Sequence, residues 1–297
     1  MCFKNALFEY TNAKIKLSEP MKKHTGYGVG GCARYYAEVD TLYSLNLLIN
    51  LAKQYRVKYK VIGNGTNILV SDLGFDGIII DTKRLNDVFL KRENVKAMAG
   101  ATLEKVIRFN LDHKLGGLET LSGIPATIGG AIVMNAGAFG HNISDHLLTV
   151  ETLRNGKIKT YDKNECKFAY RKSKFIHKNE IVISATFSFP SADKEVILSG
   201  IKSYAEIRKS IQPQGRSCGS VFINPKPLSA GALIEKAGLK GYEIGGAKIS
   251  EKHANFIVTN QNARAKDVYL LIQEIKQKVK DAFGIQLNTE VECVGEF

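Results

Sequence analysis

Two segments of the sequence carry glycines in positions that could bind a ligand through the backbone. The first comprises Gly63, Asn64, Gly65, Thr66 and Asn67, and it lies between two apolar runs. Because glycine has no Cβ, Gly63 and Gly65 can adopt positive φ angles and turn successive amides toward one anion, such as a pyrophosphate. The segment lacks the residues of the G-x-G-x-x-G and P-loop motifs. The alternative is a tight hairpin, since Asn-Gly is the commonest hairpin signal.

The second segment, residues 122–140, is almost free of charge. Such a stretch makes a poor solvated loop, but its amides and small side chains could lie against a large flat aromatic ligand. The alternative is a buried pair of strands with tight bends, which also requires glycines.

Apolar periodicity predicts the helices that position these segments. One helix begins near Thr41, and a second follows Thr102, a candidate N-cap, with the glycine pair 116–117 ending it. The clearest pattern covers residues 268–283, and Gly284 stands where a left-handed C-cap is expected.

The rest of the pattern predicts strands and one weaker helix. Strand-like runs rich in Val, Ile, Phe and Tyr cover residues 57–62, 77–81, 180–189 and 255–258. The weaker helix is expected over residues 194–208, after a turn at residues 190–193 that is a candidate domain boundary. Strands and helices do not alternate strictly and several hairpins are expected, so the fold class is α+β.

Composition limits the class of protein. The 297 residues carry 42 Lys+Arg against 29 Asp+Glu, a formal charge of +13, which favours polyanionic partners such as nucleic acid, an anionic membrane or phosphorylated small molecules. The basic residues form short, dispersed groups, which argues against nucleic acid. No run approaches the roughly 18 apolar residues of a membrane span. The five cysteines are scattered and show no metal-ligand spacing, so no metal is expected and a cytoplasmic location fits best.

At the two glycine segments the sequence resembles the UDP-N-acetylenolpyruvoylglucosamine reductase family. Further blocks follow in the family's order, and together they cover most of the chain from residue 24: residues 24–31, 170–173, 219–225, 230–235 and 245–256. The chain departs from the usual pattern at Gly28, where the family has a bulky or basic residue, and at Ile223, where it often has Lys. Its length is similar to that of the shorter form of the family.

The resemblance implies a fold and a cofactor. The fold would be a two-subdomain FAD-binding unit of the vanillyl-alcohol-oxidase (PCMH) type, residues 1–80 and 81–190, followed by a C-terminal α+β substrate-binding domain, residues 191–297. FAD would be held non-covalently, with NADPH as the hydride donor. Besides residues 63–67, the implied FAD contacts are Ser122, Gly123, Ile124, Pro125, Thr127, Gly129, Gly130, Asn135, Ala136, Gly137 and Ala138.

The implied reaction reduces the enolpyruvyl ether of UDP-N-acetylglucosamine to UDP-N-acetylmuramate, a step of peptidoglycan precursor synthesis. Hydride would add to C3 and a proton to C2. Arg171 and Glu290 would stabilise the developing enolate, and Ser220 would deliver the proton. A carboxylate would repel an enolate, so Glu290 is expected to be protonated or balanced by a cation.

The substrate contacts implied by the resemblance are Asn224, Lys202, Lys248, His253 and Asn255. Without the resemblance, Glu290 would be interpreted as a surface acid, Ser220 as a turn residue, Lys202 as a solvated charge and His253 as a structural histidine.

Two other functions remain open from the sequence. The first is a flavin-dependent oxidase or dehydrogenase of small alcohols with the same fold, and the second is a basic nucleic-acid-binding protein. The preferred interpretation implies a UDP-sugar substrate and NADPH as partners, no nucleic acid, no membrane and a monomeric protein.

Overall fold

The computed structural model describes residues 2–176 and 180–297, and the chain folds into two compact units. Unit 1 comprises Met1–Lys16, Tyr35–Asn64 and Gly77–Arg208, and unit 2 comprises Leu17–Arg34, Gly65–Asp76 and Lys209–Phe297. Both contain helices and strands, as the α+β prediction required. The predicted three-part division at residues 80 and 190 stays a prediction.

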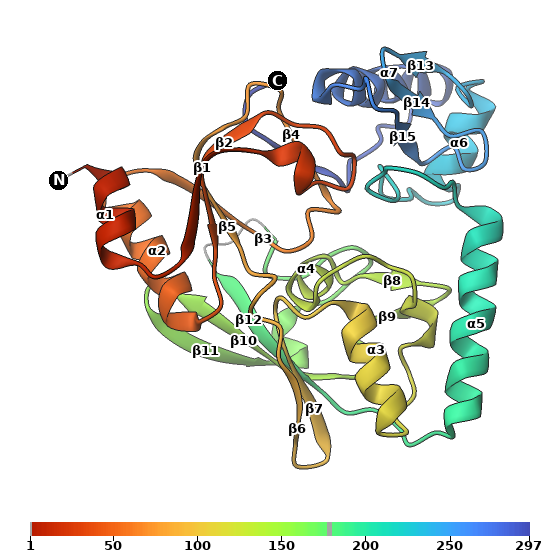
Figure 1. Ribbon diagram of the computed structural model, residues 1–297. Coiled ribbons are helices and arrows are strands. Elements are labelled where there is room, and N and C mark those ends of the chain that lie inside the picture. The colour runs from red at the N-terminus through yellow and green to blue at the C-terminus, as the bar shows by residue number, and fades with distance from the viewer. Residues whose placement is uncertain (1, 177–179) are drawn as a thin grey trace. The chain divides into compact units, whose positions relative to one another are not determined.

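The N-terminal elements belong to a four-stranded sheet in the order β1-β2-β5-β3. Its strands are β1 (Lys14–Pro20), β2 (Cys32–Glu38), β5 (Phe75–Asp81) and β3 (Lys58–Ile62), and β3 pairs with β5 in parallel. Helices α1 (Phe3–Tyr10) and α2 (Leu42–Gln54) lie side by side in unit 1 (Figure 1). Leu45 and Leu48 of α2 are fully buried with Ile78 and Ile80 of β5, so one apolar face of the helix closes this core.

A five-stranded antiparallel sheet forms the second part of unit 1, in the order β11-β10-β12-β7-β6. Its strands are β6 (Val88–Lys91), β7 (Asn94–Met98), β10 (Leu147–Arg154), β11 (Lys157–Asp162) and β12 (Ile181–Phe187). Its core also includes buried residues of α3 (Leu103–Asp112) and α4 (Ile128–Met134). The short strands β8 (Gly137–Ala138) and β9 (His141–Asn142) pair with each other, and α5 (Lys194–Ile211) follows β12.

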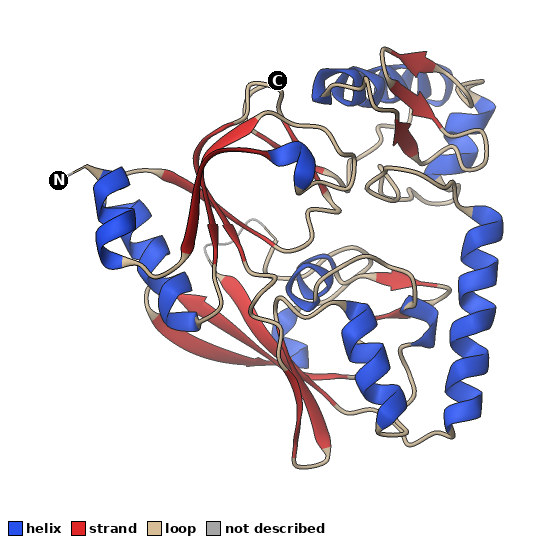
Figure 2. Ribbon diagram, in the orientation of Figure 1, coloured by secondary structure: helices blue, strands red, loops and turns tan. Residues whose placement is uncertain are grey.

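In unit 2, α6 (Ala230–Lys236) and α7 (Ala265–Phe283) pack with the three-stranded sheet β13-β14-β15 (Figure 2). The strands of that sheet are β13 (Glu243–Ile244), β14 (Ala247–Ile249) and β15 (Ile257–Thr259). A further pair joins β4 (Ile68–Val70) to β16 (Glu292–Val294) in parallel.

Several predicted helix ends are confirmed. Thr41 and Thr102 are N-caps, and their hydroxyls accept hydrogen bonds from the amides of Ser44 and Lys105 at 3.1 Å. Gly284 ends α7 with φ +68°, the left-handed C-cap that the sequence predicted.

One predicted helix end is wrong. Helix α3 ends at Asp112 and not at the glycine pair 116–117. Lys114 takes the left-handed conformation (φ +56°), and the Leu115 amide turns back to the Asn110 carbonyl at 2.9 Å. The turn that ends the helix therefore forms before the glycines, at the cost of placing a lysine in αL.

Candidate active site

The pyrophosphate loop, residues 63–67, is not a hairpin. Strand β3 before it pairs with β5, whereas β4 after it pairs with β16 near the C-terminus, so the two flanking strands lie in different sheets. The hairpin alternative is therefore wrong. Gly65 has φ +65°, as predicted, but Gly63 is not in the positive-φ region. Position 63 therefore requires glycine for a reason other than its φ angle.

Close packing explains Gly63. A Cβ on Gly63 would lie 2.1 Å from Oγ1 of Thr127, in the second glycine segment. One residue on, the Asn64 side chain donates a hydrogen bond to the Pro125 carbonyl at 3.0 Å. Gly63 and Asn64, both predicted to bind FAD, therefore lie against the second glycine segment, which is predicted to bind FAD as well.

The second segment is partly helical. Residues 128–134 form α4, with Thr127 as N-cap and Asn135 in the left-handed region at its end, so the alternative of a simple strand pair is wrong. Gly129 packs closely against Ala99, because a Cβ on Gly129 would lie 3.0 Å from Cβ of Ala99. Asn135 is 3% exposed; its Nδ2 donates to the Ala169 carbonyl at 3.0 Å, but its Oδ1 has no hydrogen-bond partner among the described residues.

These observations fit a bound flavin dinucleotide. The orphaned Oδ1 of Asn135 is a buried acceptor that needs a donor, because leaving it unsatisfied costs about 1–3 kcal/mol. In the pyrophosphate loop, the amides of Asn64 and Gly65 have no partner within residues 2–176 and 180–297. Both segments therefore offer backbone or amide groups to a ligand with phosphate oxygens and a ring that carries donors.

Arg171 is held at the second glycine segment, residues 122–140, which is called the flavin segment from here on. Residues 169–172 form a tight turn closed by reciprocal hydrogen bonds of 3.0 Å between Ala169 and Lys172, and Arg171 adopts φ +51° within it. From there its Nη2 donates to the Gly137 carbonyl at 2.8 Å, and its guanidinium lies over the Tyr170 ring at 5.2 Å. The structure thus brings a predicted catalytic cation to a predicted cofactor residue.

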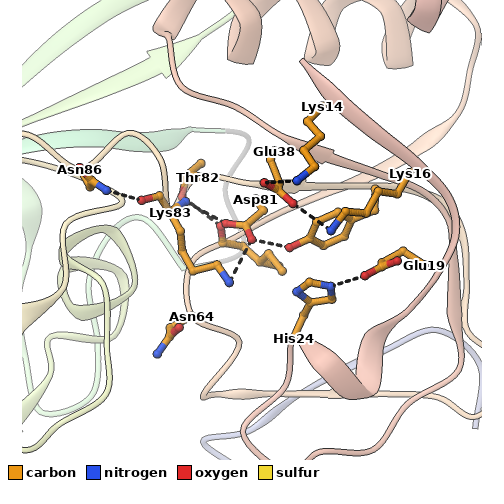
Figure 3. Close-up of polar contacts among 12 residues, drawn as sticks. Lys14, Lys16, Glu19, His24, Glu38, Asn64, Asp81, Thr82, Lys83 and Asn86 are labelled. Carbon is orange, nitrogen blue, oxygen red and sulfur yellow. Dashed lines mark hydrogen bonds and ion pairs between the residues drawn. The ribbon is translucent and has the colours of Figure 1, made fainter. Parts of the chain in front are cut away.

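A polar cluster that the sequence analysis did not identify fixes the strand end next to the pyrophosphate loop (Figure 3). Asp81 ends β5 and is 3% exposed; it accepts hydrogen bonds from the Tyr36 hydroxyl and from the Lys83 amide at 2.8 Å. Thr82 donates through its amide and its hydroxyl to the Ile62 carbonyl, at 3.1 and 3.0 Å. The last residue of β3 is therefore anchored before the chain enters the loop.

Within unit 2, Ser220 and Glu290 lie on neighbouring extended segments. Ser220 forms a bridge with Phe256, and the Glu290 amide donates to the Val221 carbonyl at 2.8 Å. Asn255 is 2% exposed and bonds the Phe222 main chain twice, with its Oδ1 accepting from the amide and its Nδ2 donating to the carbonyl, both at 2.9 Å. Asn255 therefore fixes the extended segment that carries Ser220.

Two other side chains of unit 2 are neutral near physiological pH. Partial burial lowers the pKa of His253 from its ordinary value of 6.5, and its Nδ1 accepts a hydrogen bond from the Asn255 amide at 3.2 Å. Burial raises the pKa of Cys218 to about 12, so this neighbour of Ser220 stays a thiol and not a nucleophilic thiolate.

The remaining predicted substrate residues have different surroundings. Lys248 is paired with Glu251 at 2.7 Å and Glu243 at 3.1 Å, and the hydrogen bond that its ammonium group donates to Glu251 is the main reason that the pKa of Lys248 is raised. Asn224 Oδ1 accepts from the Ala230 amide at 3.0 Å, at the start of α6. Lys202 lies exposed on α5 in unit 1.

The structure explains why this chain has glycine at position 28, where the family usually has a bulky or basic residue. Gly28 has φ +64°, and a Cβ there would lie 2.6 Å from Cδ of Arg216. The Arg216 side chain thus occupies the space that a larger residue at position 28 would need. The nearby His24 is paired with Glu19 at 2.9 Å, also within unit 2 (Figure 3).

Among residues 2–176 and 180–297, no helix combines the length and apolar character needed to cross a bilayer. In the same residues, no three His, Cys, Asp or Glu side chains are grouped so that they could hold a metal ion.

Comparison with known proteins identifies the family. Residues 33–161 match the FAD binding domain family, and residues 212–294 match the family of the UDP-N-acetylenolpyruvoylglucosamine reductase C-terminal domain. The UDP-N-acetylenolpyruvoylglucosamine reductase of Caldanaerobacter subterraneus subsp. tengcongensis is 42% identical over 285 residues, 95% of this chain and 94% of that protein. That of Carboxydothermus hydrogenoformans is 40% identical over 99% of this chain and 98% of its own length.

The chain belongs to the UDP-N-acetylenolpyruvoylglucosamine reductase family. A crystal structure of this reductase from Thermus caldophilus agrees, with 34% identity, a TM-score of 0.82 and coverage of 96% of this chain and 100% of that one. BBE-like 1 of Physcomitrella patens, 17% identical with a TM-score of 0.52 over 64% of this chain and 45% of its own, shares the fold alone.

Membership confirms the main predictions. The chain is an FAD-binding oxidoreductase with UDP-N-acetylenolpyruvoylglucosamine reductase activity in peptidoglycan precursor synthesis, and its fold joins an FAD-binding unit of the PCMH type to the family's C-terminal domain. The family uses FAD and NADPH. The rival prediction of a small-alcohol oxidase gave no reason for the match over residues 212–294.

Proposed function

We propose that this reductase adds hydride to C3 and a proton to C2 of the enolpyruvyl group, with FAD held non-covalently by residues 63–67 and 122–138. The flavin supplies hydride transfer between NADPH and the substrate. The protein supplies the binding, the charge that meets the developing enolate, and the proton.

The observation that best supports this proposal is the hydrogen bond from Arg171 to the Gly137 carbonyl. It fixes the guanidinium at the flavin segment, so the cation is oriented before the substrate arrives. An arginine oriented in advance stabilises a developing negative charge without reorganising, and its planar fork suits a carboxylate.

Ser220 and Glu290 complete the proposed catalytic set. Their segments are joined through Val221, whose amide donates to the Asn255 carbonyl at 2.8 Å while its carbonyl accepts from the Glu290 amide. This pairing limits independent movement of the two side chains. A serine hydroxyl is a weak acid, so it can protonate C2 only when an enolate has formed beside it in a site closed to water. Glu290 is proposed to be protonated or balanced by a cation.

The proposed substrate residues are Asn224, Lys202, Lys248, His253 and Asn255. For Lys248 the role requires exchange of partners, because Glu243 and Glu251 already hold its ammonium group. Exposed ion pairs of this kind contribute only about 0–1 kcal/mol, so a phosphate group can replace one of the carboxylates at little cost. His253, neutral in the fold, would act as a hydrogen-bond donor through Nε2 and not as a cation.

The wider setting is part of the proposal. The enzyme would work as a cytoplasmic monomer on a UDP-sugar and NADPH, without nucleic acid, membrane or metal. Residues 1–80 and 81–190 would be the FAD-binding subdomains and residues 191–297 the substrate-binding domain.

Separating the two half-reactions tests the roles. In Ser220→Ala, anaerobic reduction of the flavin by NADPH should proceed as in the wild type, whereas reoxidation by the enolpyruvyl sugar nucleotide should slow by about 10²- to 10⁴-fold, the usual effect of losing a general acid. Ser217→Ala, a half-buried serine of the same segment, is the control and should leave both rates unchanged. If both half-reactions fall together in Ser220→Ala, Ser220 is structural.

A further inference from the structure

Arg208 contacts the start of the flavin segment. This residue lies on α5 and is the last residue of unit 1. Its Nε donates to the Ser122 carbonyl at 3.0 Å and its Nη2 to the Thr120 carbonyl at 3.3 Å. Gly123 has φ +80°, and a Cβ there would lie 3.2 Å from Cδ of Arg208, so the Arg208 side chain packs closely against this glycine.

The same side chain contacts the end of the segment. The guanidinium lies over the Phe139 ring at 5.4 Å, and that ring packs on Tyr204, one helical turn before Arg208, with centroids 5.1 Å apart. Residues 204 and 208 share a face of α5, so one helix face contacts residues 122 and 139, which are 17 positions apart in the sequence. The predicted flavin contacts from Ser122 to Ala138 lie between these two attachment points.

We propose that Arg208 is a positioning residue for FAD, which holds both ends of the segment 122–139 in the conformation that accepts the flavin ring; the proposal rests on the proposed function of residues 122–138. Arg208 itself need not touch the cofactor. Its role is to fix the separation of the two ends through three directed contacts made by one planar group.

The chemistry of the guanidinium explains why arginine suits this position. Its five N–H donors lie in one plane, so it can bond two carbonyls at its edge while its face covers an aromatic ring. Lysine has a single ammonium and cannot make both edge contacts together with the face contact. Partial burial lowers the pKa of Arg208 from its ordinary value, but the group remains a cation at neutral pH.

The test compares FAD with ADP as probes, because ADP carries the pyrophosphate but no flavin ring. Dissociation constants for both are measured on deflavinated Arg208→Gln and Arg208→Lys, with the thermal midpoint of each apoprotein recorded separately. Lys209→Gln is the matched control, since it removes the same charge from the next, exposed residue of the helix. We expect Arg208→Gln to raise the dissociation constant for FAD about tenfold, the effect of losing one charge-assisted hydrogen bond, with ADP binding unchanged. Arg208→Lys should lie between this variant and the wild type.

The outcomes separate this inference from the function on which it rests. If Arg208→Gln binds FAD as tightly as Lys209→Gln does, the positioning role is refuted while the function stands. Equal losses for FAD and ADP, together with a lower apoprotein midpoint, would make Arg208 a general structural residue and would also overturn the inference. Failure of the wild-type protein to bind FAD would refute the proposed function itself. If Arg208→Gln does not fold, Arg208→Lys is judged by the same criteria.

Discussion

The contact between Gly63 and Thr127 gives the sharpest prediction. The two residues belong to the two segments proposed to bind FAD, and a Cβ on Gly63 would lie 2.1 Å from Oγ1 and 3.1 Å from both Cβ and Cγ2 of Thr127. Thr127 is 2% exposed and cannot move into solvent. Its Oγ1 also caps α4 by accepting from the Gly130 amide at 3.4 Å. Gly63→Ala therefore forces one of these contacts to change.

The expected cost follows from the distances. Ordinary contact begins near 3.4 Å, so relieving the closest overlap requires a shift of about 1.3 Å (3.4 − 2.1). Overpacking of this kind costs about 1–3 kcal/mol. Rotating the hydroxyl away instead removes the N-cap, which contributes about 1 kcal/mol. Gly63→Ala should thus destabilise the apoprotein by about 1–3 kcal/mol, and it should weaken FAD binding because the adjacent amides of Asn64 and Gly65 move.

A double-mutant cycle tests the cause. Thr127→Ala alone should cost about 1 kcal/mol through the lost cap, but in the Gly63→Ala background it removes the clashing oxygen. The double variant should therefore be more stable than the sum of the single effects by at least 1 kcal/mol, as packed neighbours usually are coupled. Stabilities come from urea unfolding followed by circular dichroism. Gly231→Ala in α6, where a Cβ would meet only contacts of 3.6 Å or more, is the control and should be neutral or stabilising by about 0.5–1 kcal/mol. Effects that add to within about 0.5 kcal/mol would refute the proposed contact.

Two further predictions concern pH. Partial burial of Glu151 raises its pKa, but hydrogen bonds from Lys96 and Ser184, both 2.6 Å, outweigh this and leave its pKa below the ordinary 4.5. The stabilisation is complete above that value and is lost as the pH falls through the lower folded pKa. Urea unfolding should show Glu151→Gln about 1 kcal/mol less stable than wild type at pH 7, and this deficit should shrink as the pH is lowered below 4.5; a deficit that does not change with pH would contradict this. For His253 the folded pKa lies below 6.5, so the unfolded chain takes up the proton first and stability falls as the pH drops through 6.5. His253→Asn keeps an acceptor for the Asn255 amide but does not titrate, so its unfolding free energy should change less between pH 7 and 5 than that of the wild type; parallel curves would show that His253 is not responsible.

Helix ends that depend on residues within about one helical turn could be predicted from the sequence. Thr41 and Thr102 cap helices because a hydroxyl reaches an amide three residues on, and Gly284 ends α7 because only glycine enters the left-handed region without cost. The family resemblance, which the relatives confirm, implied that the chain binds FAD, and the assignment of FAD contacts to the glycine segments stays a prediction.

Distant partners explain what the sequence did not reveal. Asn64-Gly65 carries the strongest short-range hairpin signal, yet β3 pairs with β5 and β4 with β16, a strand more than 200 residues away. Residues 128–134 contain two glycines, which disfavour a helix, but packing against Ala99 overrides that preference. Arg208 had no sequence signal at all, because its proposed role depends on hydrogen bonds to carbonyls more than 80 residues earlier.

Two of the proposed site residues adopt backbone conformations that their residue types disfavour, and hydrogen bonds of the fold hold them there. Asn135 and Arg171 are not glycines, yet both adopt left-handed backbone conformations, with φ of +45° and +51°. Such conformations cost about 1–3 kcal/mol each and persist only where surrounding contacts fix them. Here each side chain anchors the other residue's segment, since Asn135 donates to Ala169 and Arg171 donates to Gly137. Glycine at either position would relieve the strain but would lose the hydrogen bond that crosses between the segments. The two strained residues thus hold together a part of the second glycine segment and the block at residues 170–173 that the family resemblance indicates.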